Sequence, residues 1–150
     1  MPQSLAKIYI HLVFSTKHRD PCLPRELQND LHAYMGGTLN GLGCAPIEIN
    51  SEPDHVHALF LLGRTVALSE LIRVLKKSSN DWLRGRAPKL DAFHWQAGYG
   101  AFSVSQSAAD EVREYIRGQY EHHKTVSFQD EYRAFLRRYQ VAFDEQYVWD

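Results

Sequence analysis

The sequence is short of cysteine and of long apolar runs, and each shortage excludes a class of protein. Its 150 residues include two cysteines, Cys22 and Cys44. Neither lies in a CxxC or Cys/His pattern typical of a metal site, so we expect free thiols in a cytoplasmic protein. No stretch approaches the ~20 apolar residues of a membrane helix, and residues 1–11 do not resemble a signal peptide. We therefore expect no membrane association.

The sequence also lacks an excess of either charge, since its 17 lysines and arginines nearly balance 18 acidic residues. Strong nonspecific binding to nucleic acid usually accompanies a basic excess, so only a local basic patch is left as a binding surface. Basic residues do cluster, at 17–19, 73–77 and 84–89. For each cluster the alternative is an ordinary solvated surface.

No internal repeat or linker divides the chain, so we expect one domain over residues 1–150. Apolar periodicity predicts strands at 7–15, 45–51, 55–62 and 98–105, and helices from Pro24 to the glycines at 36–43, then at 67–84, 107–124 and about 127–138. We expect the aromatic tail after residue 138 to pack back onto the domain. The order β-α-β-β-α-β with extra helices predicts an α+β, ferredoxin-like fold with a four-stranded antiparallel sheet. One face of such a sheet is covered by two helices, and the other is available to a ligand, a partner chain or further helices.

The segment EPDHVHALFLL, residues 52–62, places two histidines in a strand that is otherwise typical of a protein core. Residues two apart share a face of a strand, so His55 and His57 project together, with Val56 opposite. Two neighbouring imidazoles suit a divalent metal, but they are equally compatible with ordinary hydrogen-bonded histidines near a strand end. Asp54 could orient one imidazole from outside the metal's ligand shell, or cap the preceding turn.

A metal held by two histidines needs another ligand, and the predicted helix 107–124 offers candidates. Tyr115 and Gln119 are four residues apart and therefore share a face. Gln119 is a neutral oxygen ligand, and Tyr115 is a possible nucleophile if a nearby cation helps to lower its ordinary pKa of ~10. The alternative is that Tyr115 packs and Gln119 is solvated. His122 could approach the same site or be a surface residue.

Five sequence blocks, taken together and in order, resemble the single-tyrosine transposases of the HUH nuclease superfamily. The blocks are HLVFSTKHRDPCL, PDHVHALF, GAFSVSQS, YIRGQYEHHKTVSFQDEY and DEQYVWD. They extend over almost the whole chain, and they are similar to the small transposases of bacterial and archaeal insertion sequences.

This resemblance implies a function and a site. His55 and His57 would be the two histidines of the HUH motif, and Gln119 would complete a site for Mg²⁺ or Mn²⁺. Tyr115, on one of the additional C-terminal helices, would attack a phosphodiester in single-stranded DNA, forming a 5′-phosphotyrosine and releasing a 3′-hydroxyl. Two imidazoles alone suit Zn²⁺ or Mn²⁺ better than Mg²⁺, unless water and phosphate oxygens fill an open octahedral site.

The resemblance also implies partners: single-stranded DNA with a hairpin at each element end, and a second copy of the chain. In such a homodimer the tyrosine helix of one chain can complete the histidine site of the other, and residues 105–110 are small and polar enough for a flexible connection. The first strands can pair across the dimer, with a central strand as the alternative. Our candidates for phosphate contacts are Lys17, His18, Arg19, Arg73, Lys76 and Lys77.

Two other functions stay open at this point. One is a noncatalytic nucleic-acid-binding module on a ferredoxin-like sheet. The other is a domesticated relative of the transposases, such as those that act on repeated extragenic palindromes.

Overall fold

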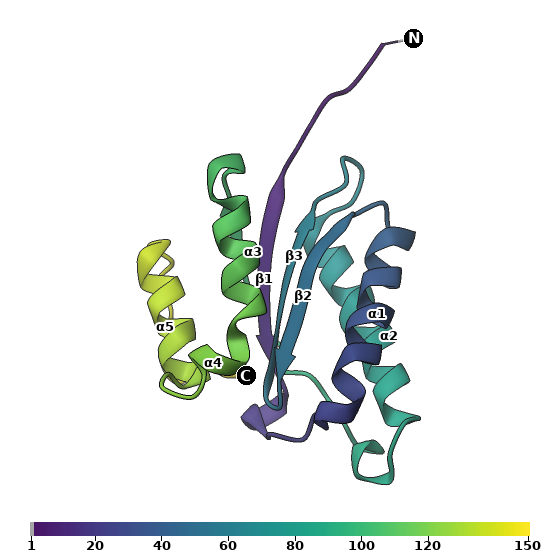
Figure 1. Ribbon diagram of the computed structural model, residues 1–150, viewed down its shortest axis with the longest axis vertical. Coiled ribbons are helices and arrows are strands. Elements are labelled where there is room, and N and C mark those ends of the chain that lie inside the picture. Colours follow the sequence, from purple (N-terminus) through teal and green to yellow (C-terminus); the bar gives the residue numbers. More distant parts are fainter. Residues whose placement is uncertain (1) are drawn as a thin grey trace.

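The computed structural model describes residues 2–150 and places a four-stranded antiparallel sheet between two layers of helices (Figure 1). The strands are β1 (Tyr9–Ser15), β2 (Pro46–Glu52), β3 (His55–Leu61) and β4 (Gly100–Val104), in the order β2-β3-β1-β4. One face is covered by α1 (Arg25–Gly41) and α2 (Leu68–Arg84), and the other by α3 (Ala109–Arg117), α4 (Gln119–His122) and α5 (Phe128–Arg138). The predicted α+β, ferredoxin-like architecture is confirmed.

Strand β1 lies in the middle of the sheet, hydrogen-bonded to β3 on one side and to β4 on the other. A strand with both edges paired has no backbone groups left for a second chain. The expectation that two first strands pair across a dimer is therefore wrong, and the alternative of a central strand is correct. The edges of the sheet are β2 and β4.

Alternation along the strands divides the sheet into two chemically different faces. Along β1, Ile10, Leu12 and Phe14 join one large apolar cluster with α1 and α2. On the opposite face, Tyr9 and Val13 belong to two separate smaller clusters, packed with α3 and α5. The gap between those two clusters is where polar side chains of the sheet are buried.

The predicted helix 107–124 is interrupted in the structure. A 3₁₀ turn (Gln106–Ala108) precedes α3, and Gly118 separates α3 from the short α4. The amide of Asn50 on β2 donates hydrogen bonds to the carbonyls of Ile116 (2.8 Å) and Arg117 (3.3 Å), which satisfies groups left free at the end of α3. The interruption is thereby anchored to the sheet.

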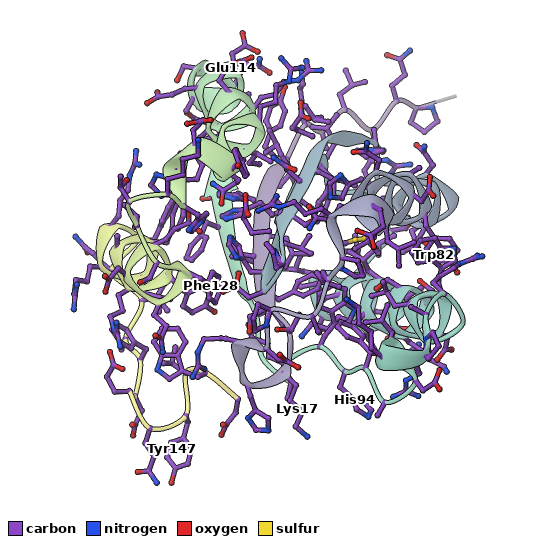
Figure 2. The ribbon with its side chains drawn as sticks, turned by 60° about the horizontal axis from the view of Figure 1, so that its bottom comes forward. Lys17, Trp82, His94, Glu114, Phe128 and Tyr147 are labelled. Atoms are coloured by element: carbon purple, nitrogen blue, oxygen red, sulfur yellow. The ribbon has the colours of Figure 1, made fainter. Side chains whose placement is uncertain are left out.

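Helix α5 and the C-terminal tail pack closely against β4. A Cβ on Gly100 would lie 3.0 Å from the ring of Tyr132, so glycine is what allows α5 to approach the strand. Figure 2 shows Phe128, the first residue of α5, on the side of the helix that faces the sheet. The amide of Gly98 donates to the carbonyl of Asp150 (2.8 Å), so the expectation that the tail packs back is confirmed.

Two further features of the chain concern its cysteines and its helices. Cys22 and Cys44 carry free thiols. Within residues 2–150, no helix combines the length and the apolar character needed to cross a membrane.

Candidate active site

A cluster of buried polar side chains lies between β3 and the helices α3 to α5. His55, His57 and Gln119 are 0% exposed, and Glu131 is 3% exposed. A buried polar group without a partner costs about 1–3 kcal/mol, so each of these side chains needs a bonding partner or a bound ligand. The partners that they have define the site.

The two histidines share a face, as their spacing predicts, and each is held through its outer ring nitrogen. His55 Nδ1–H donates to Asp54 Oδ1 at 2.6 Å, and His57 Nδ1 lies 2.8 Å from Nε2 of His11. Both Nε2 atoms therefore point into the cluster. Burial lowers the pKa of His57, and burial together with the charge of His57 lowers that of His11 to about 3, so both rings favour the neutral form that a metal ligand requires.

Gln119 and Tyr115 reach the histidines within the same chain. Gln119 Oε1 lies 3.2 Å from His55 Nε2 and accepts a hydrogen bond from His123 Nε2 at 2.7 Å. The Tyr115 hydroxyl donates to the carboxylate of Glu131 and lies 3.2 Å from Nε2 of His122. Burial, followed by the charge of Glu131 and its hydrogen bond, raises the pKa of Tyr115 well above its usual value.

Glu131 on α5 is the centre of the cluster, and the sequence interpretation did not include it. Its Oε1 lies 2.8 Å from His57 Nε2 and 3.6 Å from His55 Nε2. Its Oε2 lies 3.2 Å from His123 Nε2 and accepts the Tyr115 hydroxyl. Burial alone would raise the pKa of Glu131, but the neighbouring imidazoles, His57 first, hold it far below its usual range.

The donor atoms of this cluster suit a divalent metal. One ligand atom each from His55, His57, His123 and Glu131 lie within 4.8 Å of one another. Because the Nδ1–H of neutral His55 donates to Asp54, its Nε2 is unprotonated, and this atom faces the side-chain oxygen of Gln119 and the Glu131 carboxylate. Neither of these two oxygens can donate a hydrogen bond to His55, so the lone pair of its Nε2 is available to a proton or a cation. Imidazole nitrogen with carboxylate and amide oxygen is a ligand set that Mn²⁺ accepts, and the oxygen atoms also suit Mg²⁺.

Sequence signals for the missed residues are weak. His11 is a histidine in an otherwise apolar strand, on the same side of the sheet as His57. Glu131 lies in the first turn of a helix, where acids are common because they interact favourably with the helix dipole. His123 directly follows His122, and no local pattern distinguishes it from a surface residue. Each of these positions becomes significant only when distant segments are brought together.

The basic residues 17–19 form a 3₁₀ turn directly after β1. His18 and Arg19 both have positive φ, 59° and 57°, a conformation that costs energy in residues other than glycine. The Lys17 amide donates to the carbonyl of His94, and the Arg19 guanidinium lies 5.3 Å from the ring centre of Trp149. Lys17 and His94 are neighbours at the lower edge of Figure 2, beside a cavity of about 410 Å³. The end of β1, which leads into this turn, pairs with the start of β3, where Ser15 lies opposite His55.

The basic residues of α2 lie on the other face of the sheet, so the structure does not bring them to the histidines. Arg73 and Lys77 pair with acids of the same helix at 2.9 and 3.4 Å. Lys76 donates to three backbone carbonyls of residues 96–98, and burial lowers its pKa to about 8. These contacts tie Lys76 to the loop before β4.

Comparison with known proteins decides the family. The family described as "Transposase IS200 like" matches residues 4–119. The chain belongs to this family. As an IS200-like transposase it is an enzyme of DNA transposition, and the resemblance stated from its sequence blocks is confirmed.

Individual relatives of the transposase agree with this assignment. It is 24% identical over 116 residues to the ISDra2 transposase TnpA of Deinococcus radiodurans, which covers 74% of this chain and 83% of the relative. A solved structure from Deinococcus radiodurans R1, described as that of a transposase, has a TM-score of 0.62 at 21% identity, covering 79% of this chain and 98% of that one. A REP-associated tyrosine transposase, solved with a REP hairpin, has a TM-score of 0.59 at 14% identity, covering 84% and 74%. These structures share the fold.

Proposed function

We propose that this transposase cuts and rejoins single-stranded DNA through a covalent bond to Tyr115. The observation that supports this most directly is that Tyr115 and the histidine pair meet at one buried carboxylate, that of Glu131. A nucleophile and a candidate metal site are thus within one cluster. A noncatalytic binding module would have no reason to bury these groups together.

The proposed reaction is a transesterification at one phosphodiester bond. The Tyr115 oxygen forms a bond to phosphorus while the bond between phosphorus and the 3′ oxygen breaks. One proton leaves the phenol and one is taken up by the 3′ oxygen, so the step consumes neither water nor ATP. The product is a 5′-phosphotyrosine with a free 3′-hydroxyl, and the reverse attack by another 3′-hydroxyl rejoins DNA.

His55, His57 and Gln119 would hold a divalent metal, Mg²⁺ or Mn²⁺. When bound, it polarises the scissile phosphate and stabilises charge on the phosphoryl oxygens. The chain's own contribution is orientation. Asp54 holds Nδ1 of His55 and His11 holds Nδ1 of His57, so that the Nε2 atoms of both histidines face the same point.

For the DNA partner we propose single-stranded DNA with a hairpin. The support is the REP-associated relative, whose structure contains a REP hairpin, and the turn at residues 17–19, which offers three basic side chains beside the start of β3. Phosphate contacts from such a turn would orient the strand without reading its sequence. The same likeness keeps a domesticated, repeat-associated enzyme as the second candidate.

We also propose a homodimer, with each active site completed by its own chain. The support for a site completed within one chain is that Gln119 Oε1 lies 3.2 Å from His55 Nε2 of the same chain, whereas the dimer itself rests on the resemblance stated from the sequence. Mixing His57→Ala chains with Tyr115→Phe chains tests the arrangement. Two defective chains that restore cleavage together would show a site shared between chains, whereas a strictly monomeric species in solution would exclude the dimer.

The deciding experiment detects the covalent product. Single-stranded oligonucleotides from the DNA that flanks the gene, with and without hairpins, are incubated with the protein and Mn²⁺ or Mg²⁺ and run on a denaturing gel. We expect a DNA-linked protein band that is absent in Tyr115→Phe and present in Tyr120→Phe, since Tyr120 is 52% exposed and its ring lies against the side chains of Arg25 and Lys124. Binding without any adduct, with both metals and all substrates, would instead support the noncatalytic module. Adducts confined to repeated palindromes would support the domesticated enzyme.

A further inference from the structure

Glu131 is a buried carboxylate on a segment that the family match does not include. The match ends at residue 119, whereas Glu131 lies on α5. The first turn of α5 is capped by Ser127, whose hydroxyl accepts a hydrogen bond from the Asp130 amide at 3.1 Å. With 3% of its surface exposed, the charge of Glu131 has lost nearly all of its contact with water. Burial of a carboxylate without partners is strongly unfavourable, so the partners of Glu131 explain why its burial is tolerated.

The two carboxylate oxygens face two different parts of the site. Oε1 faces the histidine pair, 2.8 Å from His57 Nε2 and 3.6 Å from His55 Nε2. Oε2 accepts the hydroxyl of Tyr115 and lies 3.1 Å from His122 Nε2. One side chain therefore spans the distance between the histidine pair and the tyrosine.

Charge and ligand chemistry both favour contact between Oε1 and the metal. Two neutral imidazoles and the Gln119 amide would leave a divalent cation uncompensated in a buried site. Mg²⁺ and Mn²⁺ prefer oxygen ligands, and a carboxylate is the strongest that a protein side chain provides. Glu131 supplies an anionic oxygen at the point toward which both histidines are turned, which relieves the poor match between Mg²⁺ and a site of two imidazoles.

We propose that Glu131 is a bridging residue, a ligand of the metal through Oε1 and the hydrogen-bond acceptor that positions Tyr115 through Oε2. Helix α5 is then part of the active site, and metal binding is coupled to the placement of the tyrosine. The ligand role requires only that a metal binds at the histidines. The positioning role rests on the proposed function of Tyr115.

Metal affinity tests the ligand role without any reaction. Mn²⁺ is titrated into the full chain by calorimetry, with Glu131→Gln as the test variant and Asp130→Asn as its matched control. Asp130 is the preceding acid on the same helix and is exposed. We expect Glu131→Gln to bind Mn²⁺ at least ~10-fold more weakly, in keeping with the loss of an anionic ligand, and Asp130→Asn to bind as the parent does. Equal affinity in Glu131→Gln would overturn the proposal.

A second variant guards against a simple loss of fold. Glu131→Asp keeps the charge but withdraws the carboxylate by one methylene, so we expect a fold like that of the parent by circular dichroism and a smaller loss of Mn²⁺ affinity. If Glu131→Gln does not fold, a folded Glu131→Asp with undiminished affinity overturns the ligand role. Weaker binding in Glu131→Asp supports it.

The bridge itself has a spectroscopic signature. In protein labelled with ¹³C at the tyrosine Cζ, the Tyr115 resonance is assigned by its absence in Tyr115→Phe. We expect saturating Mg²⁺ to shift this resonance in the parent and in Asp130→Asn, and to leave it unchanged in Glu131→Asp, in which the carboxylate no longer reaches both partners. A shift of the same size in Glu131→Asp would overturn the bridge.

The two proposals fail in distinguishable ways. If the parent forms no covalent adduct but loses Mn²⁺ affinity on Glu131→Gln, the proposed function fails and the ligand role stands. If the parent forms the adduct and Glu131→Gln binds Mn²⁺ unchanged, the proposed function stands and the ligand role fails.

Discussion

The two faces of the sheet are formed by the same strands, yet they carry opposite chemistry. Toward α1 and α2, the side chains of β1 and β3 are apolar, among them Leu12, Phe14 and Val56, all 0% exposed. Toward α3 to α5, alternate positions of the same strands carry the buried histidines His11, His55 and His57. Both faces are buried and both contain apolar clusters, but only the second face also buries polar groups of these two strands, which lose their contact with water.

The helices on the two faces differ in a corresponding way. Helices α1 and α2 have 17 residues each, whereas α3, α4 and α5 have 9, 4 and 11. Helices this short are marginal by themselves and depend on tertiary contacts. On the histidine face many of those contacts are hydrogen bonds between catalytic candidates. We infer that the apolar face stabilises the fold and that the histidine face holds the chemistry.

The largest effect on activity should come from the histidine face. We expect His57→Ala to form no covalent DNA adduct above background on the denaturing gel, because it removes a proposed metal ligand and an anchor of Glu131. His32→Ala, a histidine of α1 on the apolar face, is the control and should form the adduct as the parent does. An adduct of undiminished yield in His57→Ala would contradict the inference that the histidine face of the sheet holds the chemistry.

The largest effect on stability should come from the apolar face. Phe14 is 0% exposed at the centre of the large cluster, and truncation of such a side chain to alanine costs about 3–5 kcal/mol in free energy of unfolding. Urea denaturation of Phe14→Ala measures this. The control is Tyr147→Ala, an aromatic that is 60% exposed, for which we expect a change within about 0.5 kcal/mol. A loss below about 1 kcal/mol in Phe14→Ala would contradict the stabilising role of this face.

An intermediate effect should come from the residues that orient the histidines. Asp54→Asn weakens the hydrogen bond that fixes the outer nitrogen of His55, and such changes typically cost ~10–100-fold in metal affinity. Calorimetric titration with Mn²⁺ measures the loss, and Asp30→Asn, an exposed acid of α1, is the control. Unchanged affinity in Asp54→Asn would mean that the aspartate serves the turn before β3 and not the site.

Local patterns in the sequence predict the parts of this molecule that depend on local physics. Alternation predicts the strands and the shared face of His55 and His57, because side chains of a strand alternate between faces whatever the rest of the chain does. The four-residue spacing of Tyr115 and Gln119 predicts their common side, and this survives the interruption at Gly118. A single glycine costs a helix only about 1 kcal/mol, which is too weak a signal to place that interruption in advance.

The remaining parts of the site depend on contacts between distant segments. Glu131 reads as an ordinary acid in the first turn of a helix until α5 is placed over β3. His11 reads as one polar residue in a central strand until its Nε2 is found 2.8 Å from His57 Nδ1. The assignment of Lys17 and its neighbours to phosphate contacts stays a prediction.

The smallest expected effect is a pH dependence of stability on the apolar face. Nε2 of His32 lies within hydrogen-bond distance of the Ser51 hydroxyl (2.7 Å), and burial lowers the pKa of His32 from 6.5 to about 4. The fold therefore favours the neutral ring. Above pH 6.5 its stabilising contribution is complete, because His32 is neutral in both the folded and the unfolded chain, and the contribution declines as the pH falls from 6.5 toward 4.

Partial exposure of the ring limits this contribution to about 2 kcal/mol. Urea denaturation at pH 7 and pH 4.5 measures it, and His32→Gln, which keeps a polar amide at this position, should lose less stability between the two pH values than the parent does. The difference between parent and variant is the informative quantity, since the histidines of the other face titrate in both. Equal losses in the two proteins would show that the acid sensitivity belongs to the histidine face alone, and the apolar face would then be independent of pH over this range.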